Sequence, residues 1–362
     1  MGSLRRVSGA RNLARAAAQK VYARWARLPL REAVLLESFE GSDPSGDPAA
    51  IAEHLQERTD LPLVWAVREP LPDVGPRVRS VRYRSAAYFK ALATSKYLIN
   101  NVTFPALFQK RDDQVYLNTW HGTPLKKMGR DVDAAYAHIA NTQENLAAAD
   151  MLLSSGSYMT DTMYVGAYGV QPESVVELGS PRVDVQFQVQ AEPDLVLYAP
   201  TWQEESPTRA VDDLDAVADR IEGIAIAAHP GTRVLVRVHG KLRDRTSGHS
   251  RLAPFLAPPE ISTNTLLART ATLITDFSSV AFDYLATGRE VLFFTPVDYP
   301  RGVYLSDAEL PGPRTDSLAT LQTWLSDGAP GADVGIEAAR ARFCPHEDGN
   351  ATVRVVDTLL SR

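Results

Sequence analysis

Short apolar runs of strand length alternate with helical patterns along the first half of the chain. The pattern predicts strands over 32–39, 61–67, 96–101, 114–120, 149–156 and 174–181. Between them, apolar positions at helical spacing predict helices over 49–58, 84–95 and 157–169. Strands that alternate with helices are typical of α/β layers around a parallel sheet.

The alternation restarts after a polar stretch. Residues 186–194, QFQVQAEPD, have no apolar period, and we interpret them as an interdomain linker. Further strands are predicted at 195–202, 233–239, 272–276 and 290–296, with helices at 212–229, 278–288 and 348–360. Two α/β halves predict a cleft between them, and ligands of such sheets bind outside the carboxyl ends of the strands.

The charge of the chain is unevenly distributed. Its 362 residues carry a formal net charge of -6, yet eight cations precede the first acid, Glu32. Among them, Leu13, Ala17, Val21, Trp25 and Leu28 recur at helical spacing. This basic amphipathic helix is typical of a segment that lies on anionic lipid, although a helix docked on its own core fits the same pattern. The acidic remainder argues against nucleic acid as a partner.

Several classes of protein are excluded by what the composition lacks. The single cysteine, Cys344, excludes a disulfide framework and favours a reducing compartment. There is no apolar run of spanning length and no cleavable leader pattern. The fingerprints of dinucleotide folds, P-loops, serine hydrolases and zinc proteases are also missing.

The stretch 118–131, NTWHGTPLKKMGRD, places His121 directly after a predicted strand. Gly122 and a proline force a sharp turn there, so the histidine can face the cleft and accept a proton. Lys126 and Lys127 are expected at the start of a following helix, where they could meet phosphate. A histidine that merely caps a turn is the alternative.

The stretch 273–288 predicts a strand that ends at Asp276, followed by a helix that Ser278 and Ser279 open. A helix start offers free N–H groups and positive potential to a diphosphate. A simple helix cap at Asp276 or Ser278 is the alternative. Asp283, one turn later, could bind a hydroxyl or only solvate the helix.

Three further segments carry groups suited to an anionic ligand. Arg237 and His239 alternate on one strand face, which fits either an anion site or an edge pair. Thr201 and Trp202 follow a strand and could contact a ligand, although that segment alone is more often structural. Arg314 follows a Pro-Gly turn that we interpret as a loop.

Taken together, eight segments in order resemble the CDP-glycerol glycerophosphotransferase family of teichoic-acid and capsule synthesis. They include 96–129, LGSPRVD, LYAPTW, VRVH, LITDFSSVAFDYL and ELPGP. The resemblance implies a GT-B architecture, in which two Rossmann-like domains face a central cleft after the basic helix. We expect that helix at 1–29, an acceptor domain at 30–190, a CDP-donor domain at 191–344, and a C-terminal helix at 345–362 that returns to the first domain.

The resemblance also implies a mechanism. A hydroxyl of a lipid-linked acceptor attacks the β-phosphorus of a CDP-alditol, most simply CDP-glycerol, and CMP leaves. His121 is the expected base, with His239 as a second catalytic residue. Donor binding is assigned to Arg237, Asp276, Ser278, Ser279, Asp283, Thr201 and Trp202. Gly122, Thr123, Lys126 and Lys127 are assigned to the acceptor or to charge stabilisation.

Other implications concern the setting of the reaction. The resemblance places the protein on the cytoplasmic face of the membrane. No protein-bound metal site and no certain cofactor are predicted, and a divalent cation such as Mg²⁺ remains open. Gln203 stands where the family commonly has arginine, and VRVHGK lacks the proline often found after the histidine. A GT-B glycosyltransferase that uses a nucleotide sugar, and a polyanion-binding scaffold without catalysis, are the alternative functions.

Overall fold

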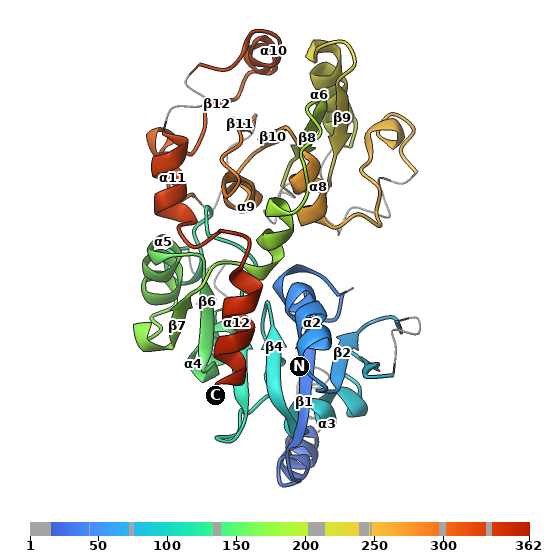
Figure 1. Ribbon diagram of the computed structural model, residues 1–362, viewed down its shortest axis with the longest axis vertical. Coiled ribbons are helices and arrows are strands. Elements are labelled where there is room, and N and C mark those ends of the chain that lie inside the picture. The colour runs from blue at the N-terminus through green and yellow to red at the C-terminus, as the bar shows by residue number, and fades with distance from the viewer. Residues whose placement is uncertain are drawn as a thin grey trace, which may run out of the picture.

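The computed structural model has two lobes, each built on a parallel sheet (Figure 1). It describes residues 16–42, 44–71, 76–132, 139–201, 214–238, 246, 248–296, 302–330 and 335–362. The lobes follow one another in the sequence, as the restart of the strand–helix pattern predicts.

The first sheet has the strand order β3-β2-β1-β4-β5-β6-β7. Its strands are β1 Arg31–Glu37, β2 Leu63–Val67, β3 Val78–Arg82, β4 Ser95–Asn100, β5 Val115–Asn118, β6 Met151–Ser154 and β7 Val175–Glu177. Leu35 faces a core that contains α3 Ala86–Thr94, α4 Ala140–Ala148 and the π-helix η3 Thr160–Ala167. Val34 and Leu36 face the opposite core, with α2 Gly46–Arg58. Burial on both faces explains the continuous apolar runs.

The second sheet has the order β12-β11-β10-β8-β9. Its strands are β8 Leu195–Ala199, β9 Arg233–Val236, β10 Thr272–Thr275, β11 Val291–Phe294 and β12 Arg314–Thr315. One face packs on α8 Thr263–Arg269 and α9 Val280–Leu285, the other on α6 Leu214–Ala227 and α10 Leu318–Asp327. Both lobes are therefore doubly wound, three-layer α/β units.

The end of the chain returns to the first lobe. After α11 Ile336–Phe343, the helix α12 Ala351–Leu360 packs against α2 (Figure 1). The returning segment is bonded to the outgoing one, η5 Pro181–Phe187. Ser180 N donates to Glu347 Oε1 at 2.9 Å, and Ala351 N donates to Asp184 Oδ1 at 3.0 Å. The two passages of the chain between the lobes thus lie side by side.

The N-terminal helix is described over 16–25 and precedes β1, at the end of the sheet opposite to the strands' carboxyl ends (Figure 1). Tyr22 is buried in the first core and makes an edge contact with Phe89. Trp25 is partly buried against the same core, whereas Val21 stays 46% exposed and Leu28 is also exposed. Leu13 lies outside the described residues. The helix therefore docks on its own lobe and still leaves part of its apolar stripe open.

Some predicted boundaries differ from the structure. The predicted linker starts inside η5, where Gln186 is buried and donates to Asn264 at 2.8 Å. No helix starts at Lys126, because the segment is extended and pairs antiparallel with Val303. This isolated bridge to a segment of the other lobe, which local sequence does not specify, accompanies the extended conformation.

Candidate active site

The site lies where the switch points of the two sheets meet. In the first sheet, the connections reverse direction between β1 and β4, and in the second between β8 and β10. A crevice forms outside the carboxyl ends of strands at such points. His121 follows β5, beside β4, while Asp276 follows β10. Both residues therefore occupy the positions where open α/β sheets bind ligands.

The orientation of His121 is set by a backbone carbonyl. Its Nδ1 lies 2.8 Å from the carbonyl oxygen of Asn101, which can only accept, so Nδ1 carries the proton. The lone pair is then on Nε2, the nitrogen a general base would use. Protein surrounding the ring, together with the positive charge of Arg182, lowers the pKa of His121 to about 4. His121 is therefore neutral at pH 7.

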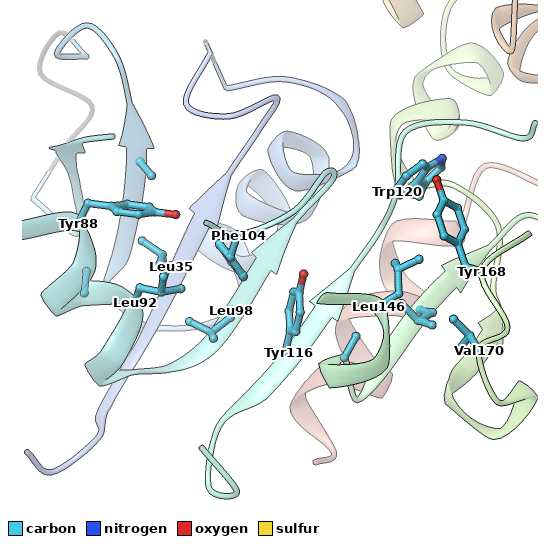
Figure 2. Packing of buried hydrophobic residues seen from close by; sticks show 14 of the residues in the cluster. Leu35, Tyr88, Leu92, Leu98, Phe104, Tyr116, Trp120, Leu146, Tyr168 and Val170 are labelled. Carbon is cyan, nitrogen blue, oxygen red and sulfur yellow. The ribbon is translucent and has the colours of Figure 1, made fainter. Parts of the chain in front are cut away.

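The indole of Trp120 packs on one face of the His121 imidazole. The two rings stack with centroids 4.4 Å apart and planes 24° apart. The indole is buried and makes an edge contact with Tyr168, so it belongs to the core of the first lobe (Figure 2). Trp120 has a φ of 51°, a left-handed conformation that a bulky residue rarely adopts. The strained turn holds His121 on a rigid platform.

Gly122 brings the second lobe against this turn. A Cβ added to Gly122 would lie 2.6 Å from Ser279 Oγ, and its φ is 143°. Glycine is therefore required both by the backbone and by the approach of Ser279. The contact places Ser279, just before α9, against the residue that follows His121 in the chain. The segment of the predicted base and one of the two predicted phosphate-binding serines therefore meet in the structure.

The lysines predicted at the site join the lobes through their backbone. Lys127 N donates to Gly302 O at 3.1 Å, next to the Lys126–Val303 bridge. The charge of Lys126 acts to lower the pKa of Asp276, although burial has the larger effect and raises it. Lys127 is exposed. Thr123, by contrast, is buried, and its hydroxyl is 2.7 Å from Ser155 Oγ.

In the second lobe, Asp276 links the ends of β8 and β10. Its carboxylate accepts from the backbone N–H and the hydroxyl of Thr201, at 3.0 Å each. Ser278 Oγ accepts from Val280 N at 3.4 Å. Arg237 donates to the carbonyls of Pro258 and Ile261, at 3.2 and 2.7 Å. These bonds show Arg237 bracing a loop.

Two predicted site residues, Trp202 and His239, lie outside the described residues, as does Gln203. Among the residues that the structure describes, no group of three or more His, Cys, Asp or Glu side chains could hold a metal ion. No described helix is long and apolar enough to cross a membrane.

A buried arginine that the sequence reasoning missed connects both lobes to the site. Arg182 donates to both oxygens of Asp283, at 2.8 and 2.7 Å, and its guanidinium is also paired with Asp47. The two carboxylates raise the pKa of Arg182 well above its usual value despite the opposing effect of burial. Asp283 is therefore engaged in an ion pair rather than exposed on its helix. The LGSPRVD segment marked this position, but the partners are 135 and 101 residues away.

Asn101 is the other missed residue. Besides holding His121, it accepts the backbone N–H of Phe39 through Oδ1, at 2.8 Å. The available signal was a polar pair, Asn100 and Asn101, at the carboxyl end of a buried strand. Such pairs are common where ligands bind.

Comparisons with known proteins identify the family of the chain. Residues 21–361 match the model of the CDP-glycerol:poly(glycerophosphate) glycerophosphotransferase family. The chain is 28% identical to the teichoic acid glycerol-phosphate transferase of Staphylococcus aureus, over 92% of this chain and 94% of that one. It is 26% identical to the teichoic acid poly(glycerol phosphate) polymerase of Staphylococcus epidermidis, over 90% of this chain and 50% of that one.

A solved structure is similar over nearly the whole chain. A variant of the wall teichoic acid polymerase TagF, soaked with CDPG, superposes with a TM-score of 0.78 at 24% identity, covering 98% of this chain and 95% of that one. This likeness confirms the predicted GT-B architecture. Because the family model spans almost the entire sequence, the chain belongs to the CDP-glycerol:poly(glycerophosphate) glycerophosphotransferase family, whose members are enzymes.

Proposed function

We propose that the protein moves glycerol phosphate from CDP-glycerol to a hydroxyl of a lipid-linked acceptor, with His121 as the general base. The observation that carries this proposal is the close approach of Ser279, on the second lobe, to Gly122, the residue that follows His121. Family membership supports the donor and the reaction class. The lipid-linked nature of the acceptor and attachment to the inner membrane face rest on the resemblance and on the exposed basic helix.

The proposed reaction is an in-line displacement. The acceptor oxygen forms a bond to the β-phosphorus, the bond from that phosphorus to the bridging oxygen breaks, and CMP leaves. His121 Nε2 takes the acceptor proton, a role that contributes about 10²–10⁴-fold. Phosphoryl transfer otherwise depends on positioning and on neutralising charge. The backbone and hydroxyls at Ser278 and Ser279, with Lys126 beside Asp276, are the groups we assign to that task.

The test is product analysis with purified protein. CDP-glycerol and an octyl-linked poly(glycerol phosphate) oligomer should yield CMP and a product extended by glycerol phosphate. A nucleoside diphosphate and a glycoside from a nucleotide sugar would instead identify a glycosyltransferase. His121→Ala should lower kcat by at least about 10²-fold with an unchanged unfolding curve. Unchanged turnover would end the general-base assignment.

The pH profile gives a separate check on His121. A base must be deprotonated, and the lowered pKa keeps the imidazole neutral well below pH 6.5. The His121-dependent acid limb of kcat/KM should therefore fall nearer pH 4 than 6.5. The same shift means that the contribution of neutral His121 to stability is present above pH 6.5 and is lost as the pH falls toward 4. NMR titration of the His121 ring, assigned by its absence in His121→Ala, measures this pKa directly.

A further inference from the structure

Phe39 is a large apolar side chain left open beside the proposed base. It follows β1 at the first sheet's switch point and is 41% exposed. Its ring meets that of His121 edge-on, with centroids 5.9 Å apart and planes 61° apart. The exposed part of the Phe39 ring is therefore available to a ligand that reaches His121.

The backbone holds this ring in place through an unusual conformation. Phe39, Glu40 and Gly41 have φ values of 43°, 56° and 80°, three consecutive left-handed residues. The turn is fixed by the Asn101 side chain on Phe39 N and by Arg68 N, which donates to Gly41 O at 2.6 Å. Two non-glycine residues in this region carry strain that only the surroundings maintain, as is found at ligand-binding sites.

Asn101 couples the ring to the base. Its carbonyl oxygen binds His121 Nδ1, and its side-chain oxygen binds Phe39 N. One residue at the end of β4 therefore sets the position of both groups. A substrate contact with Phe39 is consequently made at a fixed place relative to the Nε2 lone pair.

Protein groups already contact two other parts of the imidazole, which is otherwise exposed. Trp120 stacks on one face of the ring and is buried in the core. Nδ1 is bonded to the backbone of Asn101, and Ser279 of the second lobe approaches Gly122, the next residue along the chain. An acceptor whose hydroxyl is bonded to Nε2 also needs a surface for its carbon atoms to lie against. The exposed ring of Phe39 supplies one.

We propose that Phe39 forms the wall of the acceptor subsite and packs against the C–H surface of the polyol or sugar unit whose hydroxyl is activated by His121. This inference rests on the proposed function. It assigns Phe39 to the acceptor side of the site, because the groups proposed to bind the donor lie on the second lobe, at Ser278 and Ser279. An aromatic wall with a few polar groups is the usual construction of a small-molecule subsite.

The test is the steady-state kinetics of Phe39→Ala, with CDP-glycerol and the octyl-linked poly(glycerol phosphate) oligomer varied in turn. The KM for the oligomer should rise about tenfold, equivalent to about 1.4 kcal/mol. The KM for CDP-glycerol should change less than about twofold, since the donor is assigned to Ser278 and Ser279 on the second lobe. Phe39→Tyr, which keeps the aromatic wall, should restore the KM for the oligomer.

Phe187 provides a matched control, because it is an exposed phenylalanine at 40% that lies in η5. Phe187→Ala should leave both KM values unchanged. If Phe39→Ala retains the wild-type KM for the oligomer, the subsite assignment is wrong, whereas the transferase proposal stands. If wild-type protein releases no CMP from CDP-glycerol, the proposed function itself fails.

Discussion

Replacing Arg182 with methionine tests the ion triad that ties the two lobes together. The guanidinium is held between Asp47, at the start of α2, and Asp283, in α9. Methionine keeps much of the side-chain volume and removes the charge. Both carboxylates then lose the guanidinium, and Asp47, whose side chain is only 1% exposed, keeps the backbone N–H of residue 182 at 2.9 Å but no compensating positive charge from that residue.

The expected loss follows from that burial. Removing one member of a buried ion pair destabilises a protein by about 3–5 kcal/mol, because an uncompensated charge remains. Burial already acts to raise the pKa of Asp47, and Arg182 is the main group that opposes it. In the Arg182→Met variant, Asp47→Asn and Asp283→Asn together should recover much of the lost free energy of unfolding, because no charge of the triad is then left unpaired.

The assay is urea unfolding, with Arg58→Met as the matched control. Arg58 pairs with Asp357 at 2.6 Å, but both side chains are about half exposed. Such a surface pair is worth roughly 0–1 kcal/mol. If Arg182→Met loses no more stability than Arg58→Met, or if the Asn substitutions recover nothing, the triad does not stabilise the junction as reasoned.

Three further outcomes are expected. Gly122→Ala should reduce kcat at least about tenfold by pushing Ser279 away, whereas Gly231→Ala, equally left-handed but with open space around it, should not. Because burial raises the pKa of Glu37 to about 8, its stabilising contribution is present below pH 4.5 and lost as the pH rises through 8; Glu37→Gln should flatten the change of melting temperature between pH 5 and 8. Glutamine at Lys20, Arg24 and Arg27, three cations of the N-terminal helix, should weaken binding to anionic vesicles about 10²-fold in a sedimentation assay, at about 1 kcal/mol per charge. Binding equal to that of the wild type would refute the proposed membrane anchor.

The fold was predictable where burial alone decides local structure. The runs at 32–39 and 61–67 are buried on both faces, so their composition identifies them as central strands. The edge strand β3 was missed because its sequence, VRSVR, is mostly polar. α10 and α11 were missed because short amphipathic segments among loops carry a weak period.

The site was predictable only as separate pieces. His121 and Asp276 were found because each follows a strand, and strand ends converge at one edge of a sheet. The contact between Gly122 and Ser279 depends on how the lobes meet, which no local pattern encodes. Arg182 looked like one charge among many until its two partners came together in space. Phe39 was missed because its exposure and left-handed backbone are properties of the folded loop.

The paired passages of chain at Ser180–Glu347 and Asp184–Ala351 have a mechanical consequence. Because the two chain passages between the lobes are bonded to each other, rotation of the lobes about these passages keeps both hydrogen bonds, whereas sliding or twisting would break them. The antiparallel bridge between Lys126 and Val303 also joins the lobes, so a rotation that separates them there must break it.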